Sequence, residues 1–85
     1  MEIKINVPNY DRNFGLSDSW TDGYEIKATN ENGEISIFAN NEGLRSLATH
    51  LLALSGDNVP SGYHLHFSED YGLEEGSIDL VIGKK

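Results

Sequence analysis

The 85-residue chain carries 14 acidic side chains against 6 lysines and arginines, a formal net charge of −8 at pH 7, and no cysteine. Without cysteine, a disulfide framework, a thiolate metal site and a cysteine nucleophile are excluded. The negative charge opposes binding to nucleic acid and to anionic membranes, and it favours encounter with a basic partner. The length predicts a single domain over residues 1–85.

Two segments precede the first clear hairpin. Residues 2–7 alternate between aliphatic and polar side chains, which predicts a half-buried strand that Pro8 ends. Residues 9–23 show no sustained period and predict a long loop. This loop contains several aromatic residues, and we expect them to cover an edge of the core. Anchoring of a partner by Trp20 or Tyr10 is the alternative.

A β-hairpin is predicted from two alternating runs, residues 24–29 and 34–39. They are joined through Asn32-Gly33, the preferred dipeptide for a two-residue turn with positive φ at both positions. This turn sets Ile26 opposite Ala39, which agrees with the apolar pattern of the two runs.

A helix is predicted over residues 40–56, and the rest of the chain is expected to pack around it. Leucines and an alanine recur at three- and four-residue steps, which places them on one stripe that we expect to be buried against a sheet. The stripe consists of Leu44, Leu47, Ala48, Leu51, Leu52 and Leu54. Asn40 or Asn41 is expected to cap the first turn, and Gly56 to end the helix in a left-handed conformation.

A second hairpin is predicted from residues 63–67 and 77–82, because the apolar positions of both runs must share one buried face. The registers that allow this place His66 opposite Asp79 or Ser77, and His64 opposite Val81 or Asp79. The predicted fold class is therefore α+β, a small antiparallel-rich sheet of about five strands with one helix packed on one face, in the order β-β-β-α-β-β.

Two histidines project from the same side of the strand predicted at residues 63–67. The spacing of His64 and His66 occurs in metal sites, and Asp79 is a potential third ligand. The same positions also suit ordinary polar residues on a half-buried strand, and His50 is predicted at a flank of the helix. Neither a nucleophile elbow nor a phosphate-binding loop is recognisable, so we predict no enzyme activity, no metal and no cofactor.

An acidic loop is predicted at residues 68–76, where carboxylates flank Tyr71 and Leu73. Its spacing lacks the alternate oxygen ligands of a calcium loop. An aromatic or aliphatic anchor within a charged frame is typical of a surface that meets a basic protein. The alternative is a solvated loop with Leu73 tucked beneath it.

Four segments occur in an order and spacing that are characteristic as a set. They are Asn41-Glu42-Gly43-Leu44 with Leu47-Ala48 and Leu51-Leu52, Pro60-Ser61-Gly62-Tyr63-His64-Leu65-His66, Leu73-Glu74-Glu75-Gly76-Ser77, and Leu80-Val81-Ile82. In these segments the chain resembles the immunity protein 32 family of bacterial polymorphic toxin systems, over about residues 35–82. The resemblance implies a small cytoplasmic protein that binds and neutralises a cognate toxin.

The predicted function is therefore toxin neutralisation through an acidic surface. The expected toxin-binding residues are His64, His66, Glu69, Asp70, Tyr71, Glu74, Glu75 and Trp20. The expected partner is a protein toxin, for example a basic nuclease, and neither nucleic acid nor a membrane. The alternatives are a small metal-binding or hydrolytic module that uses His64, His66 and Asp79, and a scaffold subunit that dimerises through an open sheet edge. The N-terminus lacks the layout of a signal peptide, so we expect a cytoplasmic protein.

Overall fold

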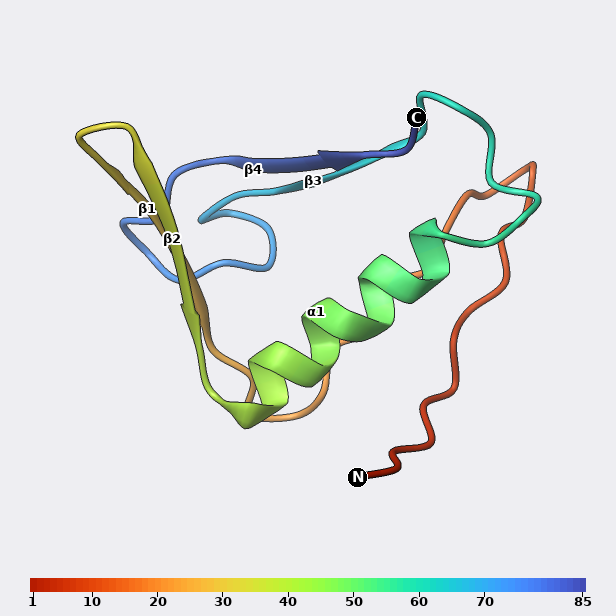
Figure 1. Ribbon diagram of the computed structural model, residues 1–85, viewed down its shortest axis with the longest axis horizontal. Helices are drawn as coiled ribbons and strands as arrows, with labels where there is room; N and C mark the ends of the chain where they lie inside the picture. The colour runs from red at the N-terminus through yellow and green to blue at the C-terminus, as the bar shows by residue number, and fades with distance from the viewer.

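The computed structural model describes all 85 residues and contains one helix and four short strands (Figure 1). In chain order these are β1 (Ile26–Glu31), β2 (Glu34–Ala39), α1 (Asn41–Leu54), β3 (His64–Phe67) and β4 (Leu80–Gly83). The strands form two separate antiparallel sheets, β1–β2 and β3–β4. The α+β class is confirmed, but two small hairpins replace the predicted single sheet.

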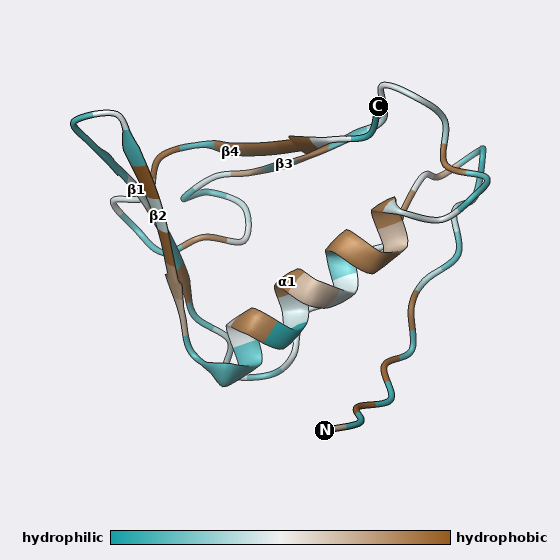
Figure 2. Cartoon of the chain, in the orientation of Figure 1, coloured by the Kyte–Doolittle hydropathy of each residue, from teal (hydrophilic) through white to brown (hydrophobic).

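The strand predicted at residues 2–7 is wrong. The first strand of the structure begins at Ile26, and the side chains of Ile3 and Val7 are exposed. Figure 2 shows that hydrophobic and hydrophilic residues alternate along this segment. Alternation alone does not make a strand, because its backbone groups need a neighbouring edge to bond with. Ile3 instead lines a shallow hollow beside Leu44 of α1.

The β1–β2 hairpin has the predicted turn and register. Ile26 lies opposite Ala39, and the ladder ends with Glu31 opposite Glu34. Asn32 adopts a φ of 53° and Gly33 a φ of 83°, the positive values that the two-residue turn requires.

The outer edge of β1 is covered by residues 74–78, which comprise the end of the acidic loop and the two residues after it. The amide of Glu74 donates to the carbonyl of Ile26 at 2.9 Å, and the amide of Ile78 donates to that of Ala28 at 2.9 Å. The amide of Ala28 in turn donates to the hydroxyl of Ser77 at 3.2 Å. These bonds join the two hairpins, and they hold the C-terminal end of the acidic loop against β1.

The same bonds explain why the β3–β4 register differs from the prediction. Leu65 lies opposite Ile82, as the apolar pattern requires, but His66 lies opposite Val81 and His64 opposite Gly83. The predicted pairings of both histidines are therefore wrong, since the observed partner of His66 is two residues beyond Asp79 and four beyond Ser77. Residues 77 and 78 bond with β1, so they are not available to pair with β3.

Helix α1 begins as predicted and ends differently. The Asn40 side chain caps it by accepting a hydrogen bond from the amide of Gly43 at 2.8 Å. At the other end Ser55 is the C-cap with a right-handed φ of −77°, so the predicted left-handed stop at Gly56 is wrong. The Ser55 hydroxyl donates to the carbonyl of Leu52 at 2.6 Å and satisfies the last turn. No helix of this structure combines the length and apolar character that a membrane crossing demands.

The predicted leucine stripe of α1 is buried only in part: Leu54 is buried and Leu47 packs against the core, but the other leucines of the stripe are exposed. The buried residues of the helix are Gly43, Ser46, Thr49, His50, Ala53 and Leu54. Leu44, Leu51 and Leu52 are 52%, 42% and 50% exposed. Small side chains at the start of the helix permit close approach to the hairpin, because a Cβ at residue 43 would collide with the carbonyl of Glu25. Ser46 then accepts a hydrogen bond from the amide of Thr21 at 2.8 Å.

The core lies between the hairpins and α1, and the loop before β1 completes it. Ile26, Ala28, Phe67 and Leu73 form its buried centre, and Trp20 packs against them. The Trp20 ring stacks on Tyr24 with centroids 4.6 Å apart. The predicted covering role of the loop at residues 9–23 is therefore confirmed for Trp20.

Candidate protein-binding site

The acidic loop at residues 68–76 is held in shape by its own backbone. Ser68 and Tyr71 exchange two hydrogen bonds, at 3.0 and 2.9 Å, and the amide of Leu73 donates to the carbonyl of Ser68 at 3.0 Å. Leu73 is buried in the core. The loop is therefore anchored by Leu73 while its charged residues stay outside, as expected for a solvated loop with Leu73 beneath it.

Trp20 lies beneath this loop. Gly72 has a φ of +92°, and a Cβ there would lie 2.9 Å from two ring carbons of Trp20. Trp20 also contacts Phe67 edge-to-face, with centroids 5.6 Å apart. The structure thus brings Trp20 to the predicted site from the inner side of the loop, where its ring lies close against Gly72.

Tyr71 is fixed by a residue that the sequence did not single out. Its hydroxyl donates a hydrogen bond to the carboxylate of Asp18, which comes from the loop before β1. This bond, with burial and the charge of Asp18 as smaller causes, raises the pKa of Tyr71 from its ordinary value of 10.0 to about 12. The ring remains partly exposed, so Tyr71 presents an apolar face held at its tip. No spacing or motif connects Asp18 with Tyr71, and only the fold brings them together.

The carboxylates of the loop divide into one that is bonded and three that are free. Glu69 accepts a hydrogen bond from the amide of Gly76 at 2.9 Å, which closes the loop. Asp70, Glu74 and Glu75 are exposed, and their side chains make no hydrogen bond or ion pair. The three free carboxylates therefore contribute negative charge to the exposed surface of the loop.

The two histidines lie on the exposed face of β3. His66 Nε2 is 3.1 Å from Asp79 Oδ2, the one ion pair of the structure if the imidazole is protonated. Asp79 lies diagonally across from His66 on β4's side of the hairpin, since Val81 is directly opposite. His64 donates from Nδ1 to the carbonyl of Gly62 at 3.3 Å. No three histidine, aspartate or glutamate side chains gather in an arrangement that could hold a metal ion, so the triad of His64, His66 and Asp79 is not formed.

His50, predicted at a flank of the helix, is buried in the core. Its Nδ1–H donates to the carbonyl of Ser46 at 2.7 Å, and its Nε2 accepts from the amide of Ser19 at 3.2 Å. A carbonyl can only accept and an amide can only donate, so these two bonds select the neutral imidazole with its proton on Nδ1. His50 therefore connects the loop before β1 to the helix, and its ring packs against that of Trp20. His50 follows Gly43 and Ser46 at helical spacing, so these three residues mark the buried face of α1 in the sequence.

These features define a small acidic α+β domain that presents free carboxylates and a fixed tyrosine from an ordered loop. The family model for immunity protein 32 (Imm32) matches residues 34–85, and the chain belongs to this family. The matched region runs from β2 to the C-terminus and includes the acidic loop and both exposed histidines. No curated protein and no solved structure matches the chain.

Proposed function

We propose that this chain is an immunity protein that binds and neutralises a cognate bacterial toxin through its acidic surface. The observation that carries the proposal is the set of free carboxylates on Asp70, Glu74 and Glu75, held by an ordered loop in a member of the Imm32 family. The proposed contacts are His64, His66, Glu69, Asp70, Tyr71, Glu74 and Glu75, with Trp20 supporting them from beneath.

The proposed mechanism is occlusion of the toxin's working surface. A toxin must be captured before it acts, so the rate of association matters as much as the affinity. Free carboxylates on one partner accelerate encounter with a basic surface on the other, and a nuclease is an example of a toxin with such a surface. Tyr71 and the exposed histidines would then supply the contact area that slows dissociation. This role requires binding and no catalysis, and it places the encounter in the cytoplasm of the producing cell.

The test begins with the product of the neighbouring open reading frame, which is expected to be the toxin. Co-expression should yield a complex that co-purifies, and stopped-flow mixing should give an association rate constant that falls steeply as salt is raised. Failure of the two proteins to form a complex would contradict toxin neutralisation.

A pair of charge variants separates steering by the loop from steering by net charge. Glu74→Gln/Glu75→Gln should lower the association rate constant about threefold to tenfold at low salt. The control Glu2→Gln/Asp57→Asn removes the same two charges outside the loop and should change the rate constant much less. Equal effects of the two double variants would remove the acidic loop from the proposal.

A further inference from the structure

The edge of the β1–β2 hairpin that β2 forms is open. In a hairpin with a two-residue turn, every second residue of each strand forms its backbone hydrogen bonds with the other strand. The bond from the amide of Asn40 to the carbonyl of Glu25 at 3.2 Å shows that the even-numbered residues of β2 are the ones that bond to β1. The backbone groups of Ile35 and Ile37 therefore point away from β1. The hydrogen bonds outside the helix and the ladders include none to either residue. While residues 74–78 cover the edge of β1, the edge of β2 has no such cover.

This edge also lacks the usual protection against pairing. Natural edge strands are blocked by lysine, proline, a bulge or a covering segment. β2 has the sequence Glu-Ile-Ser-Ile-Phe-Ala and pairs without a bulge. Ile35 and Phe38 are 62% and 74% exposed. β2 therefore combines free backbone groups with exposed apolar side chains, the two features that a strand-accepting edge requires.

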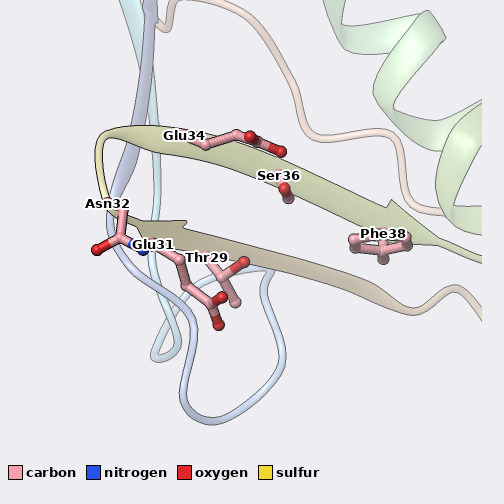
Figure 3. A pocket seen from close by; sticks show the side chains of 6 residues that line it. All are labelled: Thr29, Glu31, Asn32, Glu34, Ser36 and Phe38. Carbon is pink, nitrogen blue, oxygen red and sulfur yellow. The ribbon is translucent and has the colours of Figure 1, made fainter.

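The side chains on the outer face of the hairpin indicate that a strand bound there should be positively charged. A hollow of about 330 Å³ lies on this face, lined by Thr29, Glu31, Asn32, Glu34, Ser36 and Phe38 (Figure 3). Glu31 and Glu34 lie directly opposite each other, an arrangement of like charges that destabilises a hairpin. A cation between the two carboxylates would relieve this repulsion. The exposed ring of Phe38 on the same face offers a site for the stem or the charge of a lysine or arginine.

We propose that the β2 edge accepts an extended strand of the toxin, which adds to the β1–β2 hairpin as a third strand. Side chains alternate along a strand, so the added strand should carry lysine or arginine at every second residue, on the same face of the sheet as Glu31, Glu34 and Phe38. Its intervening residues should be apolar and lie beside Ile35 and Ile37. The inference rests on the proposed function, because the toxin supplies the strand, and it adds a second contact region remote in sequence from the acidic loop.

Charge selects a basic partner over a second copy of the chain. Each copy carries a formal charge of −8, and pairing two β2 edges would bring two sets of hairpin carboxylates together. An added strand with alternate basic residues gains the same backbone hydrogen bonds, and it replaces the repulsion between carboxylates with attraction between opposite charges.

The first experiment uses a defined probe, a blocked six-residue peptide of alternating lysine and valine, and follows amide hydrogen exchange by NMR. With the peptide, exchange of the Ile35 and Ile37 amides should slow, while Ser36 and Phe38, which already bond to β1, should be protected with and without it. A peptide of alternating glutamate and valine should have no effect. Unchanged exchange at Ile35 and Ile37 at saturating lysine–valine peptide would overturn the inference. Protection of these amides without peptide, rising with protein concentration, would also overturn it, because a second copy would then be the occupant.

The second experiment uses variants with the peptide and with the neighbouring-gene product. Ile35→Pro removes an outward donor and should weaken binding about tenfold, whereas the control Ile35→Val keeps the donor and should bind as the parent does. Glu31→Gln/Glu34→Gln removes the like charges without touching the backbone. It should fold at least as well as the parent and bind both the lysine–valine peptide and the neighbouring-gene product more weakly, so the test stands even if the proline variant does not fold.

Binding of the neighbouring-gene product separates the two proposals. If the parent chain binds it and Ile35→Pro binds it equally tightly, the strand-accepting edge is wrong and toxin neutralisation stands. If the parent chain does not bind it, toxin neutralisation itself is wrong. Tighter binding by the parent chain than by Ile35→Pro, with Ile35→Val unchanged, supports both.

Discussion

The indole of Trp20 lies over the imidazole of His50, with ring centroids 4.4 Å apart and planes inclined by 43°. His50 in turn meets Phe67 edge-to-face at 5.5 Å, so three rings from three distant parts of the chain form one cluster. Two hydrogen bonds, to the carbonyl of Ser46 and from the amide of Ser19, fix the orientation of the His50 ring. This cluster links the helix and the loop before β1 to the base of the acidic loop, and it makes His50 a structural residue.

Replacement of His50 should therefore destabilise the protein far more than replacement of an exposed histidine. His50→Ala leaves the Ser19 amide without a partner and removes the ring beneath Trp20, which should lower the free energy of unfolding by about 2–4 kcal/mol. His64→Ala, on the exposed face of β3, should change it by less than about 0.5 kcal/mol. Urea unfolding followed by Trp20 fluorescence measures both. Equal stabilities of the two variants would contradict the buried role of His50.

Gly72 should tolerate no side chain, for two separable reasons. Its φ is +92°, and an added Cβ would approach the Trp20 ring to 2.9 Å. Gly23 shares a positive φ of +80° but has nothing within 4 Å of its Cβ position. Gly23→Ala should therefore cost about 1 kcal/mol, from backbone conformation alone, and Gly72→Ala about 2–3 kcal/mol, since overpacking adds to the same strain. Thermal unfolding of both variants gives the comparison. A Gly72→Ala variant as stable as Gly23→Ala would mean that the Trp20 ring does not support the loop.

Two leucines of α1 separated by a single alanine should respond very differently to truncation. Leu54 is buried and Leu52 is half exposed. Leu54→Ala should lower the free energy of unfolding by about 2–4 kcal/mol, and Leu52→Ala by less than about 1 kcal/mol, because only the first leaves a cavity. Denaturant unfolding under identical conditions measures both. Equal losses of stability in the two variants, or a larger loss for Leu52→Ala, would contradict this difference in burial.

The parts of the fold that depend on adjacent residues could be predicted from the sequence. The Asn32-Gly33 turn fixes the hairpin register through its own φ values, and the Asn40 side chain reaches the first-turn amide without help from distant residues. Both follow from local chemistry. The same holds for the alternation that places Leu65 opposite Ile82.

The parts that depend on which surfaces meet could not be predicted. The leucine pattern of α1 predicted only part of its buried face, because close approach to the hairpin requires the small residues Gly43 and Ser46 in place of large ones. The β4 register was displaced because segment 74–78 bonds with β1. At the site, the exposed histidines and carboxylates were predicted as exposed, but the Asp18–Tyr71 bond joins two loops that no local pattern connects.

The Asp18–Tyr71 bond should make stability fall at alkaline pH. The Tyr71 phenol has a raised pKa of about 12 in the folded protein, against 10.0 for the ordinary group. The unfolded chain therefore releases this proton first, so the contribution of the bond is complete below pH 10 and is lost as the pH rises through 10 towards 12. Tyr71→Phe lacks the bond and should be less stable by about 0.5–1 kcal/mol near neutral pH, with a weaker decline above pH 10.

Near-ultraviolet absorbance of tyrosinate tests this directly. The difference between the titrations of the parent chain and of Tyr71→Phe isolates one phenol among the four tyrosines and should have its midpoint near 12. Asp18→Asn removes the charge that holds the proton on Tyr71. In a chain that carries Asp18→Asn, the midpoint of the Tyr71 titration, isolated in the same way, should therefore move back towards 10. A midpoint near 10 in the parent chain would show that Tyr71 is not held by Asp18, and the ordered aromatic contact that we propose for the toxin would lose its fixed orientation.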